Sequence, residues 1–167
     1  MAAVSTTVSA TIAAPRAPLY AWLVRGVLAN ELETVSRSTL GIAGVARASE
    51  ASGPWDVPGS YHTVFTTDGS RAREEVTAAD APGYFAYRVT EFTQPMIRRL
   101  ATEARGQWAF VDDGSGTRVR WTYSFQASAV WALPVLFPLI KLLFRRYMTS
   151  TLRLTRARAE AEVRAAL

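Results

Sequence analysis

Two residues with acid–base side chains stand close together in the sequence, on either side of a predicted turn. Glu74 occupies the middle of the stretch Arg71–Ala79, where Ala72 and Val76 share its face of an alternating strand. This alternation places the Glu74 carboxylate toward the protein interior, where it needs a hydrogen-bond partner or a raised pKa. Such a carboxylate can act as a general base, anchor the polar part of a ligand, or bridge two strands through a buried ion pair or hydrogen bond.

The single histidine, His62, lies in the preceding predicted strand, across the turn signal Asp68-Gly69. Histidine gains and loses a proton near neutral pH, so a His62–Glu74 pair would be able to move protons. A two-residue turn places His62 opposite Glu75, whereas a looser turn lets His62 and Glu74 share a face. Two interpretations remain open: an acid–base pair that lines a pocket, and an exposed or edge-strand histidine.

Other kinds of reactive site find little support in the sequence. The chain has no cysteine, which excludes a thiol nucleophile and a thiolate metal site. With one histidine, zinc or iron would have to rely on carboxylates, so we expect neither a catalytic metal nor a cofactor. The segment Leu40–Gly44 lacks the Lys-Ser/Thr pair of a phosphate-binding loop. Asp56, beside Trp55 in a loop flanked by prolines, is a further candidate near a pocket mouth.

The chain is basic, with a net charge of +5, yet its composition does not favour nucleic acid as a partner. Lys141 is the only lysine, and many of the arginines fall on one face of the last predicted helix. Residues 1–15 resemble a strand rather than a secretion signal, so we expect a cytoplasmic protein. No linker divides the 167 residues, which indicates a single domain over 1–167.

Alternating apolar residues and turn signals predict an antiparallel series of strands that is interrupted by helices only near its start. Two short helices are expected after the first strand, one around Leu19–Leu28 and one around Asn30–Val35. Pro134 and Pro138 open the last element, and the stretch Leu139–Ala165 contains no Gly or Pro and predicts one long helix. The expected strands are Val4–Ala13, Val45–Ala51, Ser60–Thr67, Arg71–Ala79, Tyr84–Phe92, Glu103–Val111 and Thr117–Ser128. The fold class is therefore α+β, with a seven-stranded antiparallel sheet against a long C-terminal helix.

Large aromatic rings recur on one face of this sheet. Alternation turns Trp121 and Tyr123 inward on the last strand, and it does the same for Trp108 on the strand before. Most of these rings are expected to form the core, but their area exceeds what one helix needs to cover. The hydroxyls of Tyr87 and Tyr123 need partners when buried, which makes them candidate polar groups of a pocket. The candidate ligand-binding set is Phe85, Tyr87, Trp108, Phe110, Trp121, Tyr123, Ile140, Phe144 and Tyr147.

The stretch Val130–Phe144 is apolar on nearly all sides. It could pack against the end of the sheet and the two short helices. Alternatively, it could form an exposed patch for a homodimer or for weak contact with a membrane surface, with Arg145 and Arg146 just beyond it.

Several short pieces, in this order and spacing, give the chain a family resemblance. They are Trp55-Asp56-Val57-Pro58-Gly59-Ser60, Thr67-Asp68-Gly69-Ser70 followed by Glu74, Phe85-Ala86-Tyr87-Arg88-Val89, Gly116-Thr117-Arg118-Val119-Arg120-Trp121-Thr122-Tyr123, and Tyr147-Met148. With the order of elements, they make the sequence resemble the START/SRPBCC superfamily, which includes polyketide cyclase/dehydrase-like and birch-pollen-allergen-like proteins. The resemblance implies a helix-grip fold, in which the sheet curves around the C-terminal helix and encloses a cavity. It also implies a glutamate at position 74, and arginine more often than histidine at position 62.

Three functions follow as hypotheses, since the superfamily does not imply one activity. The first is binding of a hydrophobic or aromatic small molecule, such as a lipid or a polyketide-like compound. The second is a cyclase/dehydratase enzyme in which His62, Glu74 or a pocket tyrosine moves protons. The third is an interaction or membrane-surface module that uses residues 130–146.

Overall fold

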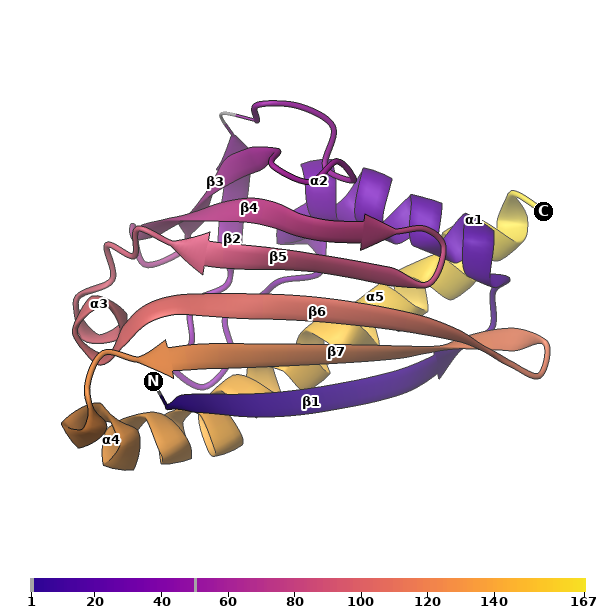
Figure 1. Cartoon of the computed structure of the whole chain (residues 1–167). Helices are drawn as coiled ribbons and strands as arrows, with labels where there is room; N and C mark the ends of the chain where they lie inside the picture. Colours follow the sequence, from indigo (N-terminus) through magenta and orange to yellow (C-terminus); the bar gives the residue numbers. More distant parts are fainter. Residues whose placement is uncertain (1, 50) are drawn as a thin grey trace.

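The computed structural model describes residues 2–49 and 51–167, whose strands form one seven-stranded antiparallel sheet (Figure 1). The strands stand in the order β1-β7-β6-β5-β4-β3-β2, so each strand from β3 onward pairs with the strand before it, and β1 pairs with β7. Their bounds are β1 Ala3–Ile12, β2 Val45–Ser49, β3 Tyr61–Thr66, β4 Arg71–Asp80, β5 Tyr84–Thr90, β6 Ala101–Asp113 and β7 Gly116–Ala127. Glu50, which was expected to extend β2, lies outside the described residues. The predicted antiparallel meander is thus present.

The connection between β3 and β4 decides which residues share a face. The backbone N–H of Thr66 donates to the carbonyl of Ser70, so three residues make the turn. Gly69 has a φ of +84°, a conformation that glycine adopts without strain and that a three-residue hairpin loop requires. In the resulting register His62 lies opposite Glu74. The looser turn is therefore the correct alternative, and the pairing of His62 with Glu75 is excluded.

The helical segments differ from the prediction mainly in their ends. After β1, α1 (Arg16–Tyr20), η1 (Ala21–Val27) and α2 (Leu28–Asn30) follow without a break, and η2 (Leu32–Thr34) is a short 3-10 turn. One helix was not predicted: α3 (Pro95–Leu100) occupies the loop around Pro95. The Gln94 side chain caps it by accepting a hydrogen bond from the Ile97 N–H.

The C-terminal helical region consists of several segments, and Pro134 stands in the first turn of its first α-helix, as predicted. A short turn, η3 (Val130–Ala132), leads into α4 (Leu133–Pro138), then the wider π-type segment η4 (Leu139–Phe144), then α5 (Arg145–Ala165). Pro138 has no N–H to donate to the preceding turn, but the helix continues through it and η4 follows directly. Within the described ranges no helix is both long enough and apolar enough to span a membrane.

The long helix lies across one face of the sheet, as Figure 1 shows for α5 behind β6 and β7. Helix α5 packs mostly against β1, whereas α1 closes the end of the sheet near the turn between β6 and β7. A bulge between Val76 and Ala78 bends β4 relative to β5. The curved sheet and the helix thereby hold an apolar core between them.

Candidate functional site

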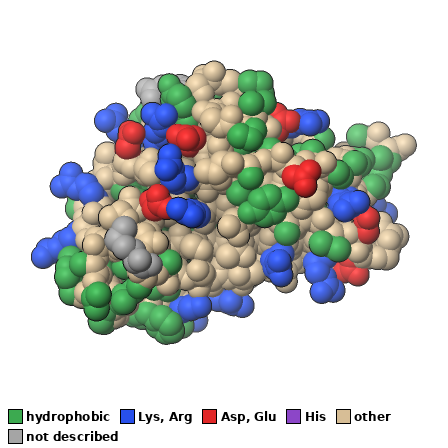
Figure 2. All heavy atoms as spheres, in the orientation of Figure 1, with side chains coloured by type: hydrophobic (Ala, Val, Ile, Leu, Met, Phe, Trp, Pro, Cys, Tyr) green, Lys and Arg blue, Asp and Glu red, His purple; other side chains and the backbone are tan. Residues whose placement is uncertain are grey.

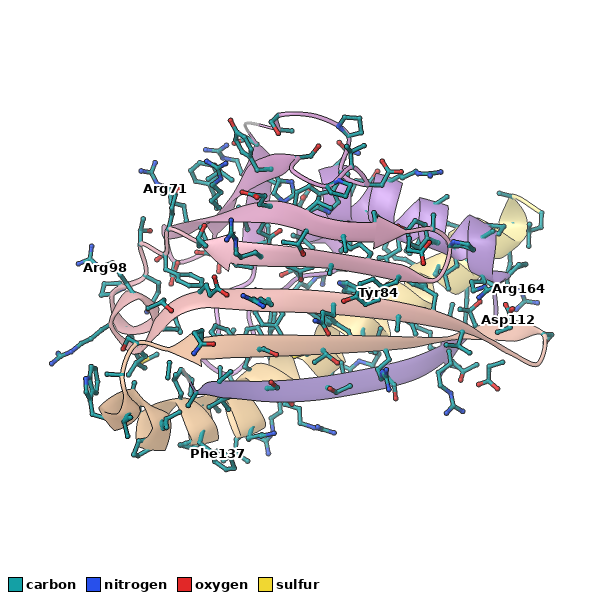
Figure 3. All side chains as sticks on the ribbon, viewed as in Figure 1. Arg71, Tyr84, Arg98, Asp112, Phe137 and Arg164 are labelled. Carbon is teal, nitrogen blue, oxygen red and sulfur yellow. The ribbon has the colours of Figure 1, made fainter. Side chains whose placement is uncertain are left out.

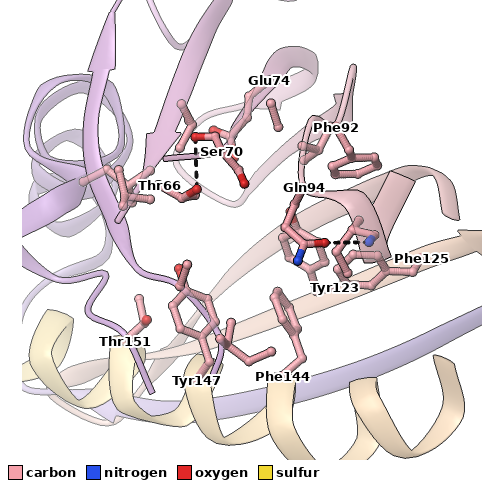
Figure 4. Close-up of a pocket in the computed structure, with 18 of the residues that line it drawn as sticks. Thr66, Ser70, Glu74, Phe92, Gln94, Tyr123, Phe125, Phe144, Tyr147 and Thr151 are labelled. Carbon is pink, nitrogen blue, oxygen red and sulfur yellow. Dashed lines mark hydrogen bonds between the residues drawn. The ribbon is translucent and has the colours of Figure 1, made fainter. Parts of the chain in front are cut away.

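A cavity of about 200 Å³ lies between the inner face of the sheet and the C-terminal helical region. Its floor is formed by the central strands and its roof by η4 and α5. Figure 4 shows Phe144, Tyr147 and Thr151 projecting toward it from the helix, while Glu74 approaches from the opposite side. Its exposed lining residues include Asp68 and Arg71 at the turn between β3 and β4, Met96 on α3 and Gly41 in the loop before β2, so the mouth opens between these segments.

The floor of the cavity is built from rings that contact one another. Trp108 and Trp121 pair across β6 and β7 and stack with their ring centroids 4.6 Å apart. Tyr123 follows with its edge toward Trp121, and it also contacts Phe144 from the roof, at 4.8 Å between centroids. Because these rings reach from sheet to helix, they hold the two layers apart as well as lining the space between them.

Gly106 gives the floor its depth at the centre of β6. It pairs with Tyr87 on one side and with Tyr123 on the other. A Cβ at this position would lie 2.2 Å from Cζ of Tyr87, so the Tyr87 ring occupies the space that a side chain would take. Glycine therefore lets the Tyr87 ring lie against the sheet rather than in the cavity.

The His62–Glu74 pair bridges β3 and β4 next to the cavity. The His62 Nε2 atom lies 2.9 Å from Oε2 of Glu74, and the indole of Trp55 stacks on the imidazole at 3.8 Å between centroids. His62 is only 1% exposed, so the interpretation as an exposed or edge-strand histidine is wrong. Glu74 and Trp55 line the cavity, whereas His62 lies behind them. The strand-bridging hydrogen bond considered for Glu74 is therefore present, and Glu74 also lines the cavity.

Several buried donors at the cavity have no hydrogen-bond partner within the described chain. Six side-chain polar atoms are buried without a partner, and four of them belong to cavity residues: the indole nitrogens of Trp55, Trp108 and Trp121, and the hydroxyl of Thr151. An unpaired buried donor typically costs about 1–3 kcal/mol of stability, so native proteins seldom keep several in one place. Water or a bound molecule can supply partners for these groups.

Three tyrosine hydroxyls reach the same space in their neutral form. Burial raises the pKa of Tyr123 and of Tyr87 well above the usual 10.0, and the negative charge of Glu74 raises both further. The indole N–H groups of Trp108 and Trp121 oppose the rise in the pKa of Tyr87, although neither meets hydrogen-bond geometry with it. Burial also raises the pKa of Tyr147, whose hydroxyl is hydrogen-bonded to Ser36. All three phenols are therefore neutral at physiological pH, and those of Tyr87 and Tyr123 can donate hydrogen bonds into the cavity.

Most of the predicted ligand-binding residues do line the cavity. Tyr87, Trp108, Trp121, Tyr123, Ile140, Phe144 and Tyr147 lie on its wall together with Glu74. Phe85 and Phe110 do not: both are fully buried, with Phe85 packed on Trp55 and Phe110 against Tyr20. They face inward as predicted, but at the end of the sheet that α1 closes. The prediction that they line the cavity is therefore wrong.

The loop between β2 and β3 contributes a different residue from the one predicted. Asp56 forms an ion pair with Arg25 at 2.5 Å and does not line the cavity. Its neighbour Trp55 lines the cavity instead and covers His62. The sequence feature that could have identified Trp55 is its place between Gly53-Pro54 and Pro58-Gly59. A large ring in such a loop usually packs inward.

The described residues contain no group of three or more His, Asp or Glu side chains placed to hold a metal ion. The polar groups at the mouth instead form hydrogen bonds with separate partners. The Thr66 hydroxyl, for example, lies within hydrogen-bond distance of the Asp68 carboxylate and the Ser70 carbonyl, and Gln94 caps α3 (Figure 4).

Comparisons with known proteins agree with this architecture. The family model described as "Polyketide cyclase / dehydrase and lipid transport" matches residues 3–160. Among solved structures, Ara h 8.0201 superposes with a TM-score of 0.69 at 14% identity, over 96% of this chain and 100% of that one. Major latex-like protein 151 from Panax ginseng superposes with a TM-score of 0.69 at 12% identity, over 93% and 97%. No curated protein sequence matches the chain.

A third similar structure is the di-domain ARO/CYC StfQ from the steffimycin biosynthetic pathway. It superposes with a TM-score of 0.67 at 18% identity, over 99% of this chain but only 53% of StfQ, so this chain spans about half of that protein. At these identities the three structures establish the fold alone. They confirm the helix-grip architecture that the resemblance to the START/SRPBCC superfamily implied.

The buried tyrosines predict a loss of stability in alkali. Their pKa is raised in the folded protein, so between the unfolded value near pH 10 and the folded value the native state holds more protons than the unfolded state. The free energy of unfolding should therefore fall as pH rises above 10, by up to about 1.4 kcal/mol per pH unit for each such group. Denaturant titrations between pH 9 and 11 measure this slope, which Tyr123→Phe should reduce. Ionisation of all six tyrosines in a protein that stays folded would contradict the assignment.

Proposed function

This chain belongs to the polyketide cyclase / dehydrase and lipid transport family, and we propose that it binds one hydrophobic or aromatic small molecule in the cavity between the sheet and the C-terminal helical region. The proposed ligand is a lipid or a polyketide-like compound. Its apolar body would lie against Trp108, Trp121 and Tyr123, whose rings already form a continuous surface.

This proposal rests mainly on the hydrogen-bond donors without a partner on a largely apolar cavity wall. The indole N–H groups of Trp55, Trp108 and Trp121 donate only, so they require an acceptor. Carbonyl or hydroxyl oxygens on the ligand would supply it, and the neutral hydroxyls of Tyr87 and Tyr123 would add further donors. A ring or chain that carries such oxygens fits this wall better than a pure hydrocarbon, which would leave the donors unpaired.

Filling the cavity tests the proposal. Ala72 lies on the cavity wall, and Ala72→Phe places a ring in the space that the ligand would use. Binding of the hydrophobic dye anilinonaphthalene sulfonate, followed by fluorescence, should be near 1:1 for the wild type and weakened at least about tenfold by Ala72→Phe, because overpacking excludes the guest.

The matched control is Ala109→Phe, which adds the same ring on the outer face of β6. It should leave dye binding unchanged. Equal loss of binding in both variants, or wild-type binding that Ala72→Phe leaves intact, would rule out this cavity as the binding site.

A second candidate function rests on the His62–Glu74 pair. Glu74 presents its carboxylate to the cavity with His62 hydrogen-bonded behind it at 2.9 Å, an arrangement that can accept and return a proton. In a cyclase/dehydratase, Glu74 would remove a proton from a carbon next to a carbonyl of a folded substrate. A neutral tyrosine such as Tyr87 would donate a hydrogen bond to the carbonyl oxygen, and the enclosing walls would hold the chain in a folded conformation.

Paired variants separate the two functions. If the protein only binds its ligand, Glu74→Gln should keep dye affinity within about threefold, because the amide retains the size of the carboxylate and a hydrogen bond to His62. A synthetic poly-β-carbonyl thioester, analysed by mass spectrometry for loss of water, should then give the same products with and without the protein. Accelerated loss of water that Glu74→Gln abolishes, and that the outer-face control Glu75→Gln preserves, would instead establish the enzyme.

A further inference from the structure

The helical segment before α5 presents large apolar side chains to solvent. We call this surface the α4 patch and define it by five residues: Val130, Trp131, Val135, Phe137 and Leu142. Val130 is 81% exposed, Leu142 is 61% exposed and Phe137 is 58% exposed. Figure 2 shows hydrophobic side chains gathered in the region where Figure 1 places α4, and Figure 3 shows Phe137 pointing away from the rest of the protein.

The patch is not a by-product of packing the helix onto the sheet. The same segment buries Leu136 and Ile140 completely on its inner side, so the fold already has the apolar contacts it needs there. A helix that only covers a sheet carries polar residues on its outer face. Here that face is apolar as well, which marks a surface that contacts something other than water.

The charged side chains that approach the rings of the patch are cations. The sequence contains no aspartate or glutamate from Gly114 to Ala159. Lys141 lies with its Nζ 5.9 Å from the centre of the Phe137 ring, and the Arg99 guanidinium lies 5.7 Å from the centre of the Trp131 ring. Arg98 points outward from the neighbouring helix α3 (Figure 3).

This pattern selects among the surfaces that could cover the patch. A second copy of the chain, related by two-fold symmetry, would bring two such groups of cations against each other. A bilayer with anionic lipids offers the opposite charge at its surface and an apolar interior just below. Tryptophan next to lysine and arginine is also typical of side chains at a membrane–water boundary.

The patch adjoins the mouth of the cavity. In η4, Leu142 faces solvent while Ile140 and Phe144 line the cavity. Helix α3 packs beside α4, and its residues Met96 and Ile97 line the mouth. A membrane or a partner that binds the α4 patch would therefore lie next to the opening through which a hydrophobic molecule enters.

We propose that the α4 patch docks the protein on the surface of a bilayer that contains anionic lipids. Trp131 and Phe137 enter the boundary between headgroups and acyl chains, and Arg98, Arg99 and Lys141 contact lipid phosphates. Docking does not depend on a ligand in the cavity, so it goes beyond the proposed binding function.

Sedimentation with lipid vesicles tests the docking. The wild type should sediment with vesicles of phosphatidylcholine mixed with phosphatidylserine, and weakly or not at all with phosphatidylcholine alone. Phe137→Asp should reduce binding at least about tenfold, because it removes an inserted ring and adds a charge. Lys141→Ala should reduce binding about fivefold, which corresponds to one cation near an anionic surface, and added salt should weaken binding in the same direction.

Two control variants introduce the same residues, aspartate and alanine, on the outer face of the sheet, at Val111 (59% exposed) and Arg120. Val111→Asp and Arg120→Ala should sediment as the wild type does. Equal binding to both kinds of vesicle, no binding to either, or equal loss in the control variants would overturn the proposal.

Light scattering of the protein without vesicles tests the alternative that a second copy of the chain covers the α4 patch. A dimer that Phe137→Asp converts to a monomer would assign the patch to a second copy and overturn docking. Phe137→Asp should leave binding of anilinonaphthalene sulfonate intact, so loss of docking and loss of the cavity's function remain distinguishable.

Discussion

The structure depends on a mismatch of width: one helix covers a seven-stranded sheet. A single α-helix, about 10 Å across, cannot fill the concave side of a sheet whose strands lie about 4.8 Å apart. The remaining space must be filled by large side chains or left as a cavity. In this chain the rings of Trp108, Trp121 and Tyr123 fill part of it, and the rest forms the cavity.

The same constraint explains the polar content of the site. Rings wide enough to reach from sheet to helix bring indole N–H and phenol groups into a region that water reaches poorly, and several of these donors find no partner in the chain. Gly106 adds depth because its missing side chain lets Tyr87 lie flat. The cavity is therefore well suited to bind an apolar molecule with oxygen acceptors. Its wall carries the carboxylate of Glu74, which is hydrogen-bonded to His62, while that of Asp68 lies at the exposed mouth.

The sequence predicted the fold well because its signals were local. Alternation and turn residues located all seven strands, and inward alternation correctly placed Tyr87, Trp108, Trp121 and Tyr123 on the cavity wall. The register of His62 was undecided, since it depends on whether the turn holds two residues or three, and Asp68-Gly69 is compatible with both. Alternation also failed to separate the cavity from the solid core: Phe85 faces inward like Tyr87, yet α1 closes that end of the sheet.

Features that depend on long-range packing were not predictable. Helix α3 is an exception, since the signals that the predicted loop overlooked are local: Pro95 starts the helix and Gln94 caps it. The position of Trp55 over His62 depends on how a loop folds back onto the sheet, which no periodicity encodes. The apolar stretch Val130–Phe144 was compatible with either burial or exposure, and the structure buries one side and exposes the other.

Native mass spectrometry of the purified protein tests the central claim most directly, since the claim is that the cavity holds one hydrophobic guest. The account predicts a species with the mass of the chain plus one small hydrophobic molecule, or full 1:1 occupancy after addition of anilinonaphthalene sulfonate, and neither species for Ala72→Phe. A wild-type protein that carries no guest and binds no dye would contradict it.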